Sequence, residues 1–492
     1  MTEPCDLPAT EARRLIGSRK LSPVELTESC IARIERVDHA VNAMVARDFE
    51  RARAAAHAAE DAVMAGNRLG RLHGLPLGIK DLEDTEGLRT TYGSLMFRDN
   101  VPKTDQHLVA TIRAAGGIVL GKTNTPEFGA GGNTRNLVYG ATGNPFDPTK
   151  SAAGSSGGSA VALATAMVPL ATGSDMGGSL RNPASFCGIV GMRPSPGLFP
   201  SEKRLLGPSG LGVLGPMARS AADLALMFDA TASHDPRDML SAPLSTDEAA
   251  SRAAADLGTL RAAFTPDFSF APTSRQTRAL FADRAARLAP LFASAEDATP
   301  DCRHADETFA ILRAVNFLAS FGATYHTDPD RLGPNVRANV EEGLRYTAAD
   351  VARALHAQTT LYGAWQRFFA THDVLITPAV TIQPRPWTEL FPAEIDGVAT
   401  KSYYHWLALA YAVTLAGHPS VCLPLGTDAD GMPFGVQIIG RRHGDRAVIE
   451  TAKAIEAMGA AMGSELSRPV PDIESLAAAR PIREMAGFLD MG

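Results

Sequence analysis

The feature that most constrains the fold of this chain is a glycine- and serine-rich segment. This segment leads directly into a run of small apolar residues. Residues 129–158 are rich in Gly, Asn, Ser, Thr and Pro, which predicts a long loop. The run AVALATAM after Ser159 predicts a helix of the core, and VPLATGSD then predicts a strand. Because a flexible linker would not pass straight into core elements, we expect this loop to be ordered and functional.

The first part of the chain is predicted to be helical. Residues 8–66 contain a capping-box pattern at Ser22–Glu25, and Ala, Arg and Glu dominate a second helix at about 48–65. After a break at GNRLG, the apolar run LHGLPLGIKDL at 72–82 predicts a buried strand that ends in Lys80–Asp81. A strand therefore follows the helical segment.

The rest of the chain alternates helical and strand patterns. Residues 110–124 predict a helix, a glycine stop and a strand at Ile118–Leu120. Residues 220–370 predict Ala-rich helices and loops, without recognisable chemistry. No repeat or linker-like boundary interrupts the pattern, so we expect one large α/β domain with helices on both faces of its sheet. Further strands are predicted at 372–380, 418–426 and 433–440, before a final helix.

Composition excludes several classes of function. The net charge is -7 and Lys and Arg are scattered, which argues against a nucleic-acid partner. The longest weakly polar stretch, 159–173, is too short to cross a bilayer, and the N-terminus lacks a secretory pattern. The five cysteines are widely spaced, which argues against a zinc site or disulfide framework, and Cys187 lies in an apolar context typical of an inert core thiol. We therefore expect a cytoplasmic protein with no metal, no cofactor and no membrane partner.

The stretch GSDMGGSLRNPA at 173–184 raises the question of a serine nucleophile. Ser179 would need a nearby base, and no histidine stands in a recognisable triad setting. The GxSxG elbow fails because Arg181 occupies the position of its second glycine. A neutral lysine is the other base, and Lys80 ends an apolar strand where burial would lower its pKa. An ordinary exposed lysine at a strand end remains the alternative at this point.

Several motifs together resemble the amidase signature enzymes, a family of serine hydrolases. The similarity extends to LSPVELTESCIARIERVD near the start and GMPFGVQIIG near the end, and so covers nearly the whole chain. Ala153 stands where glycine is usual and Arg193 where lysine is usual, and neither position carries a reacting group. The motifs are GIKD (78–81), GKTNTPEF (121–128), GNPFDPTKS (143–151), AGSSGGSA (153–160) and GSDMGGSLRNPASFCGIVGMRPS (173–195).

The resemblance implies a single large domain over residues 1–492, in which helices flank a central mixed β-sheet on both faces. Residues 1–66 would form a helical segment packed on the domain. Residues 67–200 would form the core with the catalytic motifs. Residues 201–492 would supply the remaining sheet, helices and segments of the substrate pocket.

The resemblance also implies a Ser–cis-Ser–Lys triad. Ser179 would be the nucleophile, and Ser155, in a cis peptide, would connect it to Lys80. A neutral Lys80 would take the proton of Ser179 through the Ser155 hydroxyl and later return it to the leaving amine. An acyl-enzyme intermediate would form on Ser179. Asp175 and Arg181 would support the loop around the nucleophile.

Two loops complete the site that the resemblance implies. Backbone N–H groups around the nucleophile would form the oxyanion hole. The loop after residue 128 would contribute to substrate binding. The oxyanion donors are expected from Met176, Gly177, Gly178 and Ser179, and the substrate-binding residues are Gly129, Ala130, Gly131, Gly132 and Asn133.

The expected reaction is hydrolysis of a small-molecule carboxylic amide. Aromatic residues are concentrated in 385–411, which favours a hydrophobic aryl or alkyl amide, although these rings could equally pack the core or a dimer contact. A carbamate-cleaving hydrolase and the glutaminase subunit of a tRNA-dependent amidotransferase remain alternatives, and a homodimer remains open. A non-catalytic binding protein is disfavoured because Lys80, Ser155 and Ser179 are all present.

Overall fold

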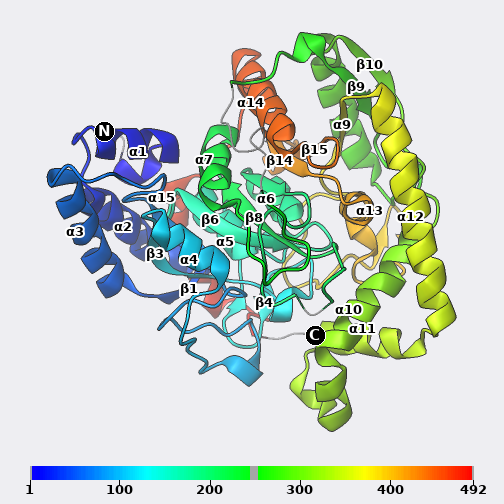
Figure 1. Cartoon of the computed structure of the whole chain (residues 1–492), viewed down its shortest axis with the longest axis horizontal. Helices are drawn as coiled ribbons and strands as arrows, with labels where there is room; N and C mark the ends of the chain where they lie inside the picture. The colour runs from blue at the N-terminus through cyan, green and yellow to red at the C-terminus, as the bar shows by residue number, and fades with distance from the viewer. Residues whose placement is uncertain (1–2, 205, 244–252, 490–492) are drawn as a thin grey trace.

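A large mixed sheet forms the centre of the computed structural model (Figure 1). In the described residues, 3–204, 206–243 and 253–489, eleven strands lie in the order β1-β3-β2-β6-β8-β7-β14-β15-β11-β9-β10. Parallel and antiparallel neighbours both occur, as the resemblance implied. The strands are β1 (Met44–Arg47), β2 (Pro76–Lys80), β3 (Ile118–Thr123), β6 (Leu170–Asp175), β7 (Val190–Arg193), β8 (Val213–Ala218), β9 (Arg261–Phe264), β10 (Ser294–Asp297), β11 (Val374–Pro378), β14 (Ser420–Thr427) and β15 (Pro433–Ile439).

Helices flank this sheet (Figure 1), and in the described residues two short hairpins lie outside it. The hairpins pair β4 (Arg135–Asn136) with β5 (Gly140–Ala141) and β12 (Glu394–Ile395) with β13 (Val398–Ala399). The α-helices are α1 (Ala9–Gly17), α2 (Pro23–Val41), α3 (Phe49–Met64), α4 (His107–Ala114), α5 (Gly157–Ala164), α6 (Arg181–Cys187), α7 (Ala221–Thr231), α9 (Arg275–Leu288), α10 (Ala305–Thr327), α11 (Pro334–Arg345), α12 (Ala348–Thr371), α13 (Ala408–Ala416), α14 (Asp445–Ala461) and α15 (Ile473–Ala478).

The local signals in the sequence correctly placed several elements. The capping box begins α2, because the Ser22 side chain accepts from the Glu25 N–H while the Glu25 carboxylate accepts from the Ser22 N–H. Strand β2 ends at Lys80 as predicted. Strand β1 lies inside the stretch predicted as helical, where Met44, Ala46 and Arg47 pair with β3 at the sheet edge. Strands β9 and β10 were likewise missed, since their pairing joins segments far apart in the chain.

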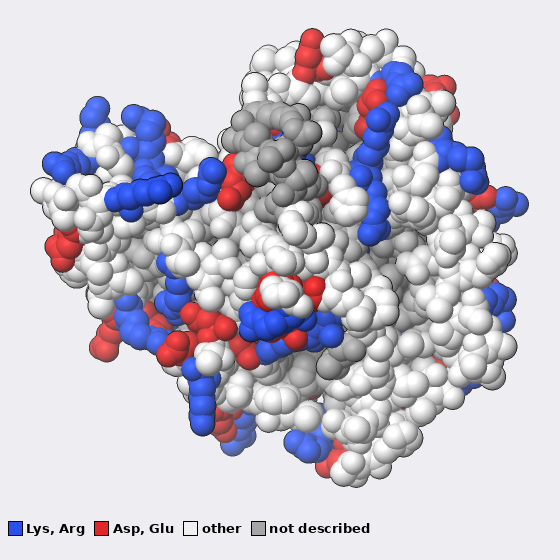
Figure 2. Space-filling model, viewed as in Figure 1, with Lys and Arg blue, Asp and Glu red and all other residues white. Residues whose placement is uncertain are grey.

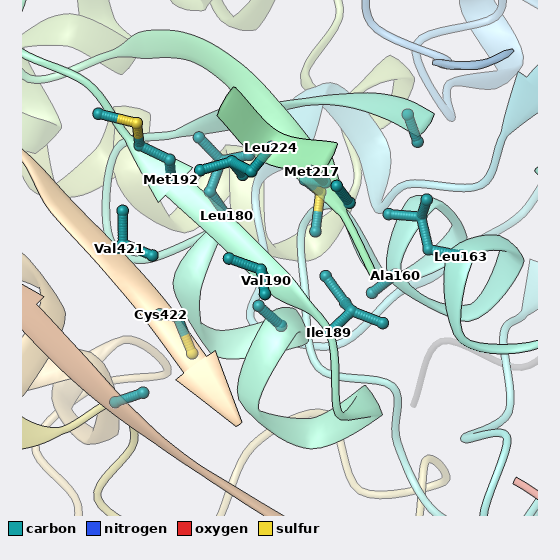
Figure 3. Close-up of a cluster of buried hydrophobic side chains, with 14 of the residues drawn as sticks. Ala160, Leu163, Leu180, Ile189, Val190, Met192, Met217, Leu224, Val421 and Cys422 are labelled. Carbon is teal, nitrogen blue, oxygen red and sulfur yellow. The ribbon is translucent and has the colours of Figure 1, made fainter. Parts of the chain in front are cut away.

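Helix α5 packs tightly behind the loop that precedes it. All of its residues are buried, and a Cβ at Gly158 would lie 2.2 Å from the backbone nitrogen of Asn124. No side chain fits at this position without displacing the backbone, which explains the glycine there. Figure 3 shows Ala160 and Leu163 of α5 in a cluster of buried apolar side chains that also includes Val190 of β7, Met217 of β8 and Cys422 of β14.

The molecular surface carries charges of both signs. On the face in Figure 2, Lys and Arg side chains lie among Asp and Glu side chains. All five cysteines are buried and none forms a disulfide, and burial raises the pKa of the Cys187 thiol. Among the described residues, no helix combines the length and apolar character needed to cross a bilayer.

Candidate active site

Lys80 lies in the interior, at the carboxyl end of the fully buried strand β2. Its Nζ lies 2.7 Å from Ser155 Oγ, 2.8 Å from Ser156 Oγ and 2.9 Å from Ser174 Oγ. These serines come from the start of α5 and the end of β6, which converge beside β2. The alternative of an exposed lysine at a strand end is therefore wrong.

The surroundings of Lys80 favour its neutral form. Burial lowers the pKa of Lys80 to about 7, although the charges of Glu83 and Asp175 act in the opposite direction. A neutral amine has two N–H bonds and one lone pair. With three hydroxyl groups around Nζ, one hydroxyl can donate to that lone pair while the other two accept. Lys80 can therefore serve as a proton acceptor near neutral pH.

Ser155 and Ser179 line the same pocket. The Gly154–Ser155 peptide bond is cis, as the resemblance implied. Ser179 lies in the turn after β6 and is half-buried, and its carbonyl accepts a hydrogen bond of 3.3 Å from the Ser156 N–H. The structure thus brings together Lys80, Ser155 and Ser179, which the sequence placed in three separate motifs.

Asp175 organises the loop that carries Ser179. Its buried carboxylate accepts from the N–H groups of Gly178 and Leu180, both at 3.1 Å. Arg181 donates to it at 3.0 and 2.8 Å, and Arg193 at 3.2 Å. Burial would raise the pKa of Asp175, but Arg181 and Arg193 outweigh it and hold this pKa well below its usual range. Asp175 and Arg181 are paired as expected, and Arg193 joins them.

The hydrogen bonds of this loop correct the predicted oxyanion hole. The Gly178 N–H points to the Asp175 carboxylate and is not free for a substrate. Gly178 has a φ of +105°, which favours glycine, and a Cβ there would lie 2.5 Å from that of Ala410. Within the described part of the chain, the N–H groups of Met176, Gly177 and Ser179 have no hydrogen-bond partner. Three donors remain where four were predicted.

The substitution Asp175→Asn should destabilise the fold strongly. It leaves Arg181 and Arg193, both fully buried, without a counter-charge. Breaking a buried ion pair in this way costs about 3–5 kcal/mol of unfolding free energy, which denaturant titration would measure. Asp301→Asn is the matched control, because Asp301 pairs with the exposed Arg303, and its unfolding midpoint should hardly change. Equal midpoints for the two variants would contradict the role of Asp175.

A small pocket of about 170 Å³ opens beside Ser179. Two predicted substrate-binding residues, Gly129 and Gly131, line it. Its wall is mostly apolar and aromatic, with a few polar groups, as ligand pockets usually are. The remaining lining residues are Leu82, Phe128, Ser155, Ser174, Asp175, Met176, Gly177, Gly212, Phe309, Arg313, Phe317, Tyr403 and Leu407.

The other predicted residues of the loop after residue 128 do not line this pocket. Ala130 is buried in a small apolar cluster. Gly132 lies against Trp406, whose ring would be 2.4 Å from a Cβ at this position. The Asn133 side chain donates to backbone carbonyls in the segment 387–389, at 2.8 and 3.0 Å. These three residues pack the loop against the rest of the fold and lie outside the lining of this pocket.

The aromatic segment 385–411 contributes one ring to the pocket, that of Tyr403. Trp387 and Trp406 are buried elsewhere in the core. Tyr411 is also buried, and its ring stacks on Phe309 with centroids 4.4 Å apart. The alternative that these rings pack the core therefore holds for most of the segment.

Helix α10 supplies pocket residues that sequence analysis missed. Phe309, Arg313 and Phe317 line the pocket, although 220–370 was expected to lack recognisable chemistry. Their spacing of four residues places them on one face of the helix, a pattern that is typical of an ordinary core-facing helix. Ser156 and Ser174 were missed as partners of Lys80, although both lie within the quoted motifs.

Comparison with known proteins shows the family of this chain. Residues 25–449 match the family model described as Amidase. The chain belongs to the amidase family. It is an amide-hydrolysing enzyme, and relatives across almost its full length include enzymes of that kind.

Three comparisons illustrate the range of these amidase relatives. The sequence is 34% identical over 462 residues to an acylamidase of Rhodococcus erythropolis, covering 92% of this chain and 95% of that protein. It is 32% identical over 480 residues to a glutamyl-tRNA(Gln) amidotransferase subunit of Chloroflexus aurantiacus, covering 93% and 97%. The crystal structure of a bacterial aryl acylamidase of the amidase signature family superposes with a TM-score of 0.86 at 27% identity, covering 96% and 99%.

Proposed function

We propose that this amidase cleaves a carboxylic amide through Ser179, Ser155 and Lys80. The observation that carries the proposal is the fully buried Lys80, whose Nζ lies 2.7 Å from Ser155 Oγ in the wall of the pocket that contains Ser179. A buried lysine with a lowered pKa, connected to a serine, is the arrangement that activates a hydroxyl nucleophile without histidine.

In this mechanism Ser179 Oγ attacks the carbonyl carbon of the amide. The Ser179 proton passes to Ser155 Oγ as the Ser155 proton passes to the lone pair of Lys80 Nζ. Collapse of the tetrahedral intermediate breaks the C–N bond, and the protonated Lys80 returns the proton through Ser155 to the leaving amine. A water molecule then cleaves the acyl-enzyme by the same proton transfers in reverse.

The oxyanion of the tetrahedral intermediate would be bound by backbone N–H groups. Those of Met176, Gly177 and Ser179 are unengaged in the described part of the chain, and all three residues line the pocket. One such donor typically lowers the barrier by about 2.7–4 kcal/mol. The Asp175 network holds the loop that presents them.

The pocket supports an aryl or alkyl amide as the substrate. Phe128, Phe309, Phe317 and Leu407 give its wall an apolar surface, and the similarity to the structure of an aryl acylamidase favours that substrate class. Glutamine hydrolysis is the second candidate, because the sequence is similar to a glutamyl-tRNA(Gln) amidotransferase subunit over almost its full length. Carbamate cleavage would begin with the same attack by Ser179.

The deciding experiment combines covalent labelling with a panel of substrates. The protein is treated with phenylmethanesulfonyl fluoride, and the modified peptide is mapped by mass spectrometry. The panel contains an anilide, a small aliphatic amide, a carbamate and glutamine. A single adduct on Ser179 with preferred turnover of the anilide is the expected result. Labelling at another residue would contradict the nucleophile, and preferred turnover of glutamine would favour the second candidate.

A further inference from the structure

Arg313 is a buried cation in the wall of the pocket that contains Ser179. It lies on α10, is only 6% exposed, and lines this pocket together with Ser155. Its Nη1 is fully buried and has no hydrogen-bond partner among the described residues. No described carboxylate lies close enough to Arg313 to form an ion pair. A buried guanidinium without a counter-charge is unusual, because desolvation of an unpaired charge is costly.

Three aromatic rings surround this guanidinium. Its Cζ lies 4.7 Å from the ring centroid of Phe317, 4.8 Å from that of Tyr403 and 4.6 Å from that of Tyr404. Such contacts stabilise a cation through the ring faces. They provide no hydrogen-bond acceptor for the N–H groups of the guanidinium edge. The rings therefore hold Arg313 in place and leave its buried Nη1 without a hydrogen-bond acceptor.

Glu342, the acidic side chain whose charge acts on Arg313, is hydrogen-bonded to other groups. Glu342 accepts hydrogen bonds from the hydroxyl groups of Tyr404, at 3.0 and 3.1 Å, and Tyr346, at 3.0 Å. Burial lowers the pKa of Arg313 to about 10, with Tyr404 and Glu342 acting in the opposite direction. Arg313 is thus positively charged at neutral pH, and the pocket presents an unpaired positive charge to whatever enters it.

We propose that Arg313 is the specificity-determining residue of this pocket and binds a carboxylate of the substrate, remote from the amide that is cleaved. A planar guanidinium matches the geometry of a carboxylate and forms strong charge-assisted hydrogen bonds with it. The apolar side chains of Phe309, Phe317 and Leu407 would contact the part of the substrate between the two groups. This inference rests on the proposed function and narrows its substrate class to amides that carry a carboxylate.

The test compares matched charged and neutral substrates in two arms. In the first arm, the p-nitroanilides of succinic, glutaric and adipic acid are compared with those of butanoic, pentanoic and hexanoic acid. In the second arm, 4-acylaminobenzoates are compared with the corresponding 4-toluidides. The wild-type enzyme should prefer the charged member of a pair in at least one arm, by about tenfold or more in kcat/KM. No preference in either arm would overturn the proposal.

The substitution Arg313→Met should remove this preference. We expect kcat/KM for the preferred charged substrate to fall by the factor of that preference, about tenfold or more, mainly through KM, while the neutral partner changes little. Arg313→Lys should retain part of the preference, because it keeps the charge and loses the fork of donors. Arg353→Met is the matched control, since Arg353 is exposed and pairs with Glu307 and Asp350 at the surface. An equal loss for charged and neutral substrates in Arg313→Met would overturn the proposal.

Labelling of Ser179 separates this inference from the proposed function. Phenylmethanesulfonyl fluoride is neutral, so Arg313→Met should react with it at the wild-type rate if its active site is folded. If Arg313→Met is not folded, Arg313→Lys provides the comparison. A wild-type enzyme that is labelled at Ser179 but shows no charge preference would contradict the role of Arg313 alone. A wild-type enzyme that is not labelled at Ser179 would contradict the proposed function itself.

Discussion

Replacing Ser179 by alanine is expected to reduce turnover by about 10⁵-fold or more, which in practice abolishes it. Without the hydroxyl, no acyl-enzyme can form, and the remaining N–H donors can only polarise the carbonyl group. The loop should stay folded, because Asp175 holds it through Gly178, Leu180 and Arg181, and none of these bonds uses the Ser179 side chain. Turnover of the best anilide and the circular dichroism spectrum would be measured together.

A matched serine variant provides the control for that result. Ser18 is exposed, and its hydroxyl donates to the nearby Leu15 carbonyl, so Ser18→Ala should retain full turnover. Folded Ser179→Ala protein with turnover close to that of the control would show that another residue is the nucleophile. Loss of labelling by phenylmethanesulfonyl fluoride in Ser179→Ala would support the assignment independently.

Lys80→Ala is expected to reduce turnover almost as much as Ser179→Ala, because substitutions of residues that act together in one catalytic unit have non-additive effects on the rate. The double variant with Ser179→Ala should therefore be no worse than Ser179→Ala alone.

The pH profile of the wild-type enzyme gives a further readout. The active form of Lys80 is the neutral amine, and its pKa is about 7. The kcat/KM of the wild-type enzyme should thus be low in acid, rise through about pH 7 and level off above it.

A second buried lysine provides the control for the pH profile. Lys122 is also fully buried, and burial lowers its pKa to about 8, but its Nζ bonds to the Glu83 carbonyl and Thr85 and not to Ser155. Lys122→Met should keep the rise from acid to neutral pH, whatever its absolute rate. A flat wild-type profile between pH 5 and 9, with chemistry limiting the rate, would argue against a lysine base. If the rise of kcat/KM from acid to neutral pH disappeared in Lys122→Met, that result would also argue against Lys80 as the base.

Local sequence patterns predicted the parts of the site that depend on near neighbours. The apolar run before Lys80 predicted strand β2 and its end, and the small residues after Ser159 predicted α5, which begins at Gly157. The pattern around Ser22 predicted the start of α2. In each case the signal lies within a few residues of the feature, where backbone propensity and side-chain period act.

Features that depend on distant partners were predicted incompletely. The Gly178 N–H was expected to donate to the oxyanion, but it donates a hydrogen bond to the Asp175 carboxylate. Asn133 was expected to bind substrate, but it bonds to the segment 387–389. The sequence shows which donors exist, and only the folded chain shows which of them find partners inside the protein. A donor that already has a partner within the fold is not available to bind a ligand.

The sequence by itself determined the family motifs, the end of β2 at Lys80, the small residues of α5 and the serine in the turn after β6. These follow from residue type and spacing along a short stretch of chain. Only the tertiary structure decided that Lys80 is buried among three serine hydroxyls and that Arg313 of α10 faces the pocket of Ser179. Burial, pKa and pocket shape arise from packing between segments far apart in sequence. Local periodicity does not predict which of these segments pack together.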